Sequence, residues 1–192
     1  MVRRLIWVRH GPTHQKAFTG WRDVPADLSD TAAISRLSRW LPESAPIISS
    51  DLKRAVSTAD AIAQGRRRLP HDQALREFDF GDWDGMHFTQ VAATHPELSR
   101  AFWEEPGDVA PPNGESWNAV TTRVSKAVDA LLTQHSGDLI LVAHFGVVLC
   151  HVAQATGMTA YEALGHQIDP LSATVLEETE TGWRAERINH AP

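Results

Sequence analysis

Three short segments of the chain have continuously apolar interiors, and this pattern constrains the fold more than any other. They are RLIWVR at 4–9, APIISS at 45–50 and DLILVAH at 138–144. Strands of this kind are buried on both faces, which is typical of parallel sheets covered by helices. Apolar residues at helical spacing follow each segment along the chain. The sequence therefore predicts an α/β protein, a three-layer α/β/α sandwich with a mostly parallel central sheet.

The remaining elements are predicted from spacing and from turn residues. We expect helices at 27–41, 51–65, 87–104, 116–135 and 146–157. The third of these should break at His95-Pro96, because proline disfavours helical backbone at the residue before it. A short strand is expected around ALREF at 74–78. The segments SATVLEE at 172–178 and GWRAERI at 182–188 alternate like a pair of edge strands.

Composition is that of an ordinary globular protein, expected to form one domain over residues 1–192. The chain is 42% hydrophobic and 22% charged, and a core of this size needs no disulfide or metal to hold it together. The formal net charge of −6 argues against nucleic acid as a partner. The one basic cluster, RRR at 66–68, is expected to be a solvated turn.

The chain shows no sign of a membrane partner. No run of about 18 apolar residues occurs, and the apolar run in the opening MVRRLIWV is too short for a signal peptide. The single cysteine, Cys150, lies in the apolar run VVLCHVA, which predicts a buried thiol in a reducing compartment. We therefore expect a cytoplasmic protein.

Cationic and imidazole side chains follow all three buried strands. The first strand ends in Arg9 and His10, the second is followed by Arg54, and the third ends at His144. Ligands bind where the strands of such sheets hand over to helices at their carboxyl ends. These four side chains are therefore expected to meet at one edge of the sheet.

Two of the same junctions also offer helix N-termini. Arg54 falls in the first turn of a helix expected to be capped by Ser50 or Asp51, and the helix after His144 is expected to begin near Gly146. Arginine in the first turn of a helix opposes the macrodipole unless an anion is bound there. Arginine forks beside free backbone N–H groups predict a phosphate site.

Five segments, in this order and spacing, resemble the histidine phosphatase superfamily, also called the phosphoglycerate mutase-like family. They are RHG at 9–11 followed by Thr13, SSDLKRAVSTA at 49–59, LREFDFGDWDG at 75–85, NGESWNAVTTR at 113–123 and LVAHFG at 141–146. The resemblance runs over nearly the whole chain. It implies a phosphatase that needs no metal and no cofactor.

The resemblance also implies roles for individual residues in a two-step phosphoryl transfer. His10 would attack phosphorus as a neutral imidazole and become phosphohistidine. Arg9, Arg54 and His144 would bind the three equatorial oxygens. Glu77 would protonate the leaving oxygen and then activate water, which requires a raised pKa.

Substrate binding is expected to involve a second group of side chains. Thr13 and Gly11, beside the nucleophile, would complete the phosphate cradle, and Lys16 stands where the family often has asparagine. Phe145 stands where a small residue is usual and would give the leaving group an apolar wall. Trp21 is expected to line the cleft.

Two more tryptophans, Trp83 and Trp117, are expected near the cleft as well. The other four tryptophans are expected in the core, and these are Trp7, Trp40, Trp103 and Trp183. His151 lies on the same helical side as His144 and is expected to pack in the core rather than to bind metal.

The expected substrate is a small phosphorylated metabolite. Mutases of the family carry a longer segment after the FG.W.G motif, whereas this chain has only residues 86–112 there, expected to form a small cap over the site. Hydrolysis is therefore favoured, with α-ribazole phosphatase-like or sugar-phosphate phosphatase roles among the alternatives. A phosphoglycerate mutase, a phosphate-binding regulatory module without turnover and a metallohydrolase built on the ten histidines stay open, as does a homodimer.

Overall fold

The computed structural model of the protein describes residues 3–192. A central sheet holds five strands in the order β2-β3-β1-β4-β5. Their bounds are β1 Arg4–Arg9, β2 Ile47–Ser49, β3 Leu139–Ala143, β4 Ala173–Thr179 and β5 Gly182–His190. The strands predicted from the three apolar runs form the neighbouring β2, β3 and β1.

Four of the five strands run in one direction. β1 pairs in parallel with β3, with Trp7 opposite Leu141, and β2 also pairs in parallel with β3. β4 is antiparallel to both β1 and β5, so β5 has the direction of β1. The mostly parallel sheet is therefore confirmed. Of the two predicted edge strands, β5 lies at the edge and β4 lies inside the sheet.

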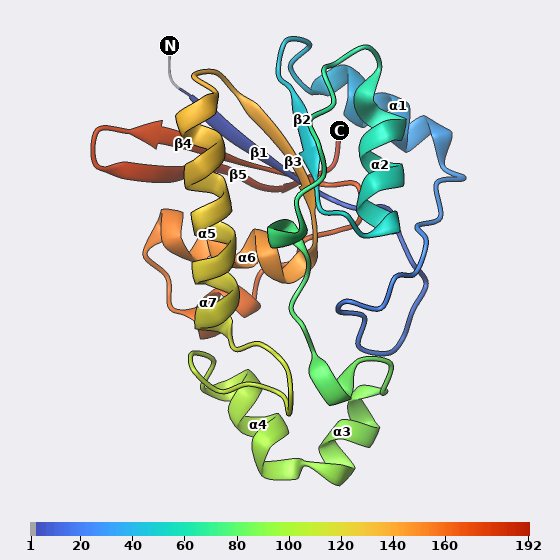
Figure 1. Ribbon diagram of the computed structural model, residues 1–192, viewed down its shortest axis with the longest axis vertical. Helices are drawn as coiled ribbons and strands as arrows, with labels where there is room; N and C mark the ends of the chain where they lie inside the picture. The colour runs from blue at the N-terminus through green and yellow to red at the C-terminus, as the bar shows by residue number, and fades with distance from the viewer. Residues whose placement is uncertain (1–2) are drawn as a thin grey trace.

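Helices cover both faces of the sheet (Figure 1). Their bounds are α1 Thr31–Trp40, α2 Lys53–Ala63, α3 Phe88–Thr94, α4 Pro96–Glu104, α5 Trp117–Gln134, α6 Phe145–Thr156 and α7 Ala160–Leu164. Helices α1 and α2 lie on one face, and α5 and α6 on the other. Within residues 3–192, no helix has both the length and the apolar character needed to cross a membrane.

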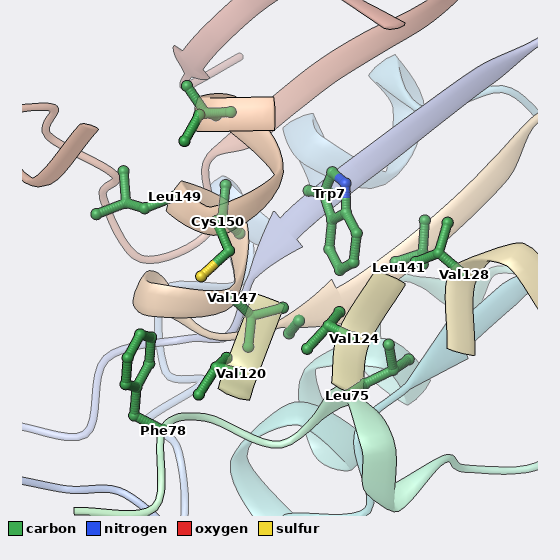
Figure 2. Close-up of a cluster of buried hydrophobic side chains, with 14 of the residues drawn as sticks. Trp7, Leu75, Phe78, Val120, Val124, Val128, Leu141, Val147, Leu149 and Cys150 are labelled. Carbon is green, nitrogen blue, oxygen red and sulfur yellow. The ribbon is translucent and has the colours of Figure 1, made fainter. Parts of the chain in front are cut away.

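Successive residues of β1 alternate between the two hydrophobic layers. Ile6 and Val8 pack towards α1 and α2, and Leu5 and Trp7 pack towards α5 and α6. Figure 2 shows Trp7 together with side chains of α5 and with Val147 and Cys150 of α6. Burial raises the pKa of the Cys150 thiol to about 12, which agrees with the predicted core thiol.

Helices α3 and α4 lie beyond the carboxyl ends of the parallel strands, at the foot of Figure 1. The break between them falls at His95-Pro96 as predicted, and Pro96 occupies the first turn of α4. Phe102 of α4 packs edge-on against Trp83, with ring centroids 5.5 Å apart. This contact packs α4 against the 3₁₀ turn that contains Trp83.

The strand expected around residues 74–78 does not form. The chain there is a 3₁₀ turn at Gln73–Leu75 followed by irregular backbone. The guanidinium of Arg123, from α5, donates to the carbonyls of Ala74, Arg76 and Glu77 at 2.8, 3.0 and 3.2 Å. A distant side chain therefore satisfies the carbonyls that a neighbouring strand would otherwise have bound.

The predicted cap of α2 is also wrong. The residue at the cap position is Leu52, which makes no side-chain capping bond. Ser50 and Asp51 have stronger partners elsewhere: Ser50 Oγ lies 2.7 Å from His144 Nε2, and the carboxylate of Asp51 accepts from Arg76 at 2.6 Å. The N–H of Lys53, the first residue of α2, instead donates to Oδ1 of Asp23 at 2.7 Å.

The basic cluster at 66–68 is not a solvated turn, because Arg66 is buried and joins two helix ends. Its guanidinium donates to the carbonyls of Ser38, in the last turn of α1, and of Leu41, directly after α1, at 2.7 and 2.6 Å. It also donates to the carbonyls of Ile62 and Ala63, in the last turn of α2, at 3.2 and 3.3 Å. A cation at two helix C-termini is electrostatically favourable.

Replacing Arg66 with Met should therefore destabilise the protein markedly. We expect a loss of about 3 kcal/mol in the free energy of unfolding, because several buried carbonyls lose a charged donor. Chemical denaturation of the variant beside the wild type measures this loss. The control is Arg67→Met, since Arg67 is exposed and should change stability by less than about 0.5 kcal/mol. Equal stability of the two variants would contradict the role assigned to Arg66.

Candidate active site

The three strand ends meet as predicted. His10 follows β1 directly, and its backbone N–H donates to the carbonyl of Ala143, the last residue of β3, at 3.0 Å. The rings of His10 and His144 then lie 5.1 Å apart between centroids. Pairing of β1 with β3 is what brings together two histidines separated by more than a hundred residues.

The ring of His10 is held in one orientation. Its Nδ1 lies 2.7 Å from the carbonyl of Gly11, which only accepts, so Nδ1 carries the proton and Nε2 holds a free electron pair. Burial, followed by the charges of Arg54 and Arg9, lowers the pKa of His10 to about 3. The imidazole is therefore neutral, as a nucleophile requires.

Gly11 allows the chain to turn closely at this point. A Cβ added there would lie 2.7 Å from Cδ2 of Leu28 and 3.2 Å from the carbonyl oxygen of Asp27, so a larger residue would require Leu28 to move. Its N–H donates to Oγ1 of Thr58 at 2.9 Å, and Thr58 in turn donates to the carbonyl of Arg54. The RHG turn is thus fixed to α2.

Arg9 presents an unsatisfied donor. Its Nη1 donates to the carbonyl of Ile168 at 2.5 Å, and its guanidinium carbon lies 5.4 Å from the centre of the Phe145 ring. Its Nε–H is buried and has no hydrogen-bond partner among residues 3–192. A buried cationic donor without a partner is costly and is suited to an anionic ligand.

Arg54 is buried beside the two histidines. Its Nε–H donates to Nδ1 of His144 at 3.2 Å, and the other nitrogens donate to the carbonyls of Arg22 and Gly20 at 3.0 and 2.6 Å. The guanidinium therefore holds the backbone at 20–22 in place. Its phosphate-binding role stays a prediction beside this observed one.

His144 is held between two partners. Nδ1 accepts from Arg54, so the ring proton lies on Nε2, which donates to Oγ of Ser50 at 2.7 Å. Burial and the neighbouring cations lower the pKa of His144 well below its ordinary value. The ring is neutral with both nitrogens engaged, and its contact with phosphate stays a prediction.

Glu77 lies against the start of α6. The N–H of Gly146 lies 3.2 Å from each of its carboxyl oxygens, and the N–H of Phe78 donates to Oε1 at 3.0 Å. A Cβ at position 146 would lie 2.7 Å from Oε1, so glycine is needed for this approach. Burial raises the pKa of Glu77, and the hydrogen bonds and nearby arginines offset this only in part.

Burial thus acts oppositely on the two candidate reactive groups. It keeps the His10 imidazole neutral and favours the protonated, neutral form of Glu77. A nucleophile and a proton donor in one enclosed site are the groups that a displacement with a basic leaving group needs.

A pocket adjoins Glu77 on the side of α3 and α4. Its volume is about 420 Å³, a figure that includes open solvent at the mouth of the pocket. Its walls are largely apolar and include Phe145, as predicted, and Trp117. Trp103, expected in the core, is instead partly exposed and lines this pocket.

Other predicted residues lie elsewhere. Trp21 donates its indole N–H to the carbonyl of Glu77 at 2.9 Å and so fixes the Glu77 backbone. Trp83 is fully buried. Thr13 and Lys16 lie on the chain leaving the RHG turn, with Lys16 exposed, and their contacts with substrate stay predictions.

His151 packs in the core as predicted, with its ring centre 4.5 Å from that of Trp7. Within residues 3–192, no three or more His, Cys, Asp or Glu side chains are grouped as a metal site would require.

Sequence reasoning missed three supporting residues. Ser50 orients His144, Thr58 holds the RHG turn, and Arg123 shapes the backbone at Glu77. All three lie inside segments that carry the family resemblance, SSDLKRAVSTA and NGESWNAVTTR. Their position in those segments is the only sequence feature that could have identified them. The residues that they bind are distant in sequence, so spacing does not reveal the contacts.

Comparison with known proteins agrees with this geometry. A glucosyl-3-phosphoglycerate phosphatase of Mycolicibacterium vanbaalenii is 34% identical over 173 residues, covering 82% of this chain and 76% of that protein. A 2,3-bisphosphoglycerate-dependent phosphoglycerate mutase of Methylorubrum extorquens is 31% identical, covering 76% of this chain and 75% of that protein. The solved structure of Bacillus stearothermophilus YhfR superimposes with a TM-score of 0.89 at 26% identity, covering 99% and 98% of the two chains.

The family model for the histidine phosphatase superfamily (branch 1) matches residues 5–191. The match spans all five motifs and nearly the whole described chain. The family expected from those motifs is confirmed, and this chain belongs to the histidine phosphatase superfamily.

Proposed function

We propose that this phosphatase hydrolyses a small phosphate monoester in two steps, with His10 as nucleophile and Glu77 as acid and base. The observation that carries the proposal is the neutral, oriented imidazole of His10, whose Nε2 has a free electron pair. Nothing in the chemistry assigned to these residues requires a metal or a cofactor.

In the first step, Nε2 of His10 attacks phosphorus in line, and the bond from phosphorus to the ester oxygen breaks. The proton of Glu77 passes to that oxygen, so the alcohol leaves neutral. In the second step, Glu77 takes a proton from water as the water oxygen attacks phosphorus. The phosphorus–nitrogen bond breaks, phosphate leaves, and both residues return to their starting forms.

Arg9, Arg54 and His144 are proposed to bind the phosphoryl oxygens, with Gly11, Thr13 and Lys16 at the rim. The Nε–H of Arg9, buried and without a hydrogen-bond partner in the described part of the chain, supports its part in this cradle. Preorganised cationic donors stabilise the charge of the transferring phosphoryl group without having to reorganise.

Residues 86–112 are proposed to be a cap segment within a single domain over 1–192. Phe102, Trp103 and Val109 of this segment share the pocket with Glu77, which supports the assignment. Trp21, which fixes the backbone of Glu77, is proposed to border the substrate rather than to enclose it.

The reaction is proposed to take place in the cytoplasm on a metabolite, without nucleic acid. The acidic net charge of −6 and the single buried cysteine support this placement. A homodimer is a further prediction, which sedimentation at several protein concentrations would test.

Purified protein should hydrolyse p-nitrophenyl phosphate at an unchanged rate when EDTA is added. The reason is that the nucleophile is a side chain rather than a metal-bound hydroxide. Release of nitrophenolate with and without the chelator measures this. Loss of activity with EDTA would favour a metallohydrolase, and absence of turnover in both samples would favour a phosphate-binding regulatory module.

A mutase is the second candidate, because a phosphoglycerate mutase is among the relatives. The same assay with 3-phosphoglycerate separates the two activities. We expect slow release of phosphate and negligible formation of 2-phosphoglycerate, since the cap segment is short. Glucosyl-3-phosphoglycerate should be tested in the same assay, because one relative is a glucosyl-3-phosphoglycerate phosphatase.

A further inference from the structure

The pocket beside Glu77 is lined almost entirely by apolar side chains. Of the residues that line it, Glu77 is the only one with a charged side chain. The others are Phe78, Phe80, Phe102, Trp103, Pro106, Val109, Trp117, Phe145, Gly146 and Leu164. Its volume of about 420 Å³ includes open solvent at the mouth, so the walls enclose only part of a group bound there.

The pocket meets the site of phosphoryl transfer at two residues. Glu77, the proposed proton donor, lies in its wall, so a group occupying the pocket is next to the acid. Phe145 lines the pocket and also lies beside Arg9, whose guanidinium carbon is 5.4 Å from the ring centre. The leaving alcohol of a phosphate ester bound by Arg9 therefore has this pocket within reach.

A polar leaving group would bind unfavourably in this pocket. Hydroxyl or carboxylate groups entering the pocket would lose hydrogen bonds to water. The aromatic and aliphatic side chains of the walls offer no hydrogen bonds to replace them. A carboxylate would also meet Glu77 without a cation among the lining residues to compensate. Aromatic walls instead favour a ring, through burial of apolar area and edge or stacking contacts.

We propose that the pocket binds the leaving alcohol and selects phosphate monoesters of apolar alcohols carrying about one aromatic ring. The proposal rests on the hydrolysis proposed above and adds the class of substrate to it. Burying a ring against these walls should favour such esters by roughly 100-fold in kcat/KM over esters of small or hydrophilic alcohols.

The test compares three primary alkyl esters: benzyl phosphate, ethyl phosphate and glycerol 3-phosphate. All three need a proton donor, so a difference between them reports the pocket rather than the chemistry. We expect benzyl phosphate to be hydrolysed roughly 100-fold more efficiently than either of the others. Equal rates, or preference for glycerol 3-phosphate, would overturn the pocket proposal and leave the hydrolase intact.

Two variants locate the effect. Trp103→Ala removes a lining ring at a position that is 39% exposed, and should shrink the ratio of benzyl to ethyl phosphate hydrolysis about tenfold. Val109→Asp, in the loop after α4, should shrink the same ratio by placing a charge in the pocket. The control is Phe88→Ala, since Phe88 is 61% exposed on α3 and does not line the pocket. A ratio unchanged in both lining variants would contradict the proposal.

Binding without turnover separates the two proposals. Benzylphosphonate resists hydrolysis and should bind roughly 100-fold more tightly than methylphosphonate by calorimetry. If no ester is hydrolysed but this preference holds, the hydrolase assignment fails and the pocket stands as a site for aromatic phosphates. If esters are hydrolysed and the phosphonates bind equally, the pocket proposal fails alone.

Discussion

His10→Ala should lose turnover by at least about 10⁴-fold, the scale seen when a catalytic nucleophile is removed. The reason is structural as well as chemical. Nε2 of His10 has a free electron pair because Nδ1 is fixed on the carbonyl of Gly11. Wild-type protein given labelled substrate and quenched should carry phosphate that is released by acid and retained in base. The variant should carry none.

The matched control for this experiment is His14→Asn. His14 lies on the same loop with an exposed side chain paired to Asp27 at 2.8 Å, and asparagine tolerates its positive φ of 55°. Labelling of this control should equal that of the wild type. Label found on a serine, or retained in His10→Ala, would overturn the assignment of the nucleophile.

Glu77→Gln should separate substrates by their leaving groups. An alkyl ester expels a strongly basic alkoxide and needs the proton, so its hydrolysis should fall by about 10³-fold. Nitrophenolate leaves without a proton, so attack on p-nitrophenyl phosphate should survive. The second step still lacks its base, and phosphohistidine should accumulate. Stopped-flow absorbance should show a burst near one equivalent of nitrophenolate, followed by slow turnover.

The pH dependence follows from the same carboxyl. Burial raises the pKa of Glu77, and the acid form exists below that pKa. The kcat/KM of alkyl esters should therefore fall as pH rises through the raised value. The pKa of His10, about 3, leaves the nucleophile neutral throughout this range. The same descending limb should be absent for p-nitrophenyl phosphate.

Glu115→Gln is the control, because Glu115 pairs with Arg123 at 2.6 Å and does not line the pocket. It should affect both substrates equally. If Glu77→Gln also loses both substrates equally and shows no burst, Glu77 is structural. The proton donor would then have to be sought among Asp79, Asp82 and Asp84.

The sheet and the meeting of its strand ends could be predicted because both depend on local signals. Continuous apolar runs mark strands buried on two faces, and parallel strands end at one edge. The positions of Arg9, His10 and His144 then follow from where the runs stop. The alternation of residues 172–178 predicts the strand β4, but nothing in the sequence indicates that this strand lies inside the sheet.

The errors share a different cause. Residues 74–78 are predicted to form a short strand, yet Arg123, more than forty residues away, binds their carbonyls. Arg66 looks solvated beside Gly65 and two further arginines, yet two helix ends converge on it. In both cases one guanidinium donates hydrogen bonds to several carbonyls that are distant in sequence. The spacing of residues along the chain does not predict such contacts.

The contact between Gly146 and Glu77 has a consequence for engineering. The proposed acid, Glu77, is held by the first turn of α6, which follows β3 after one residue. Phe102, Trp103 and Val109, by contrast, come from residues 86–112. Part of the wall proposed to select the alcohol thus lies on a separate stretch of chain from the proposed acid, whereas Phe78 and Phe145 of the same wall adjoin that acid. A library confined to the second stretch can search for new substrates while the first keeps its chemistry.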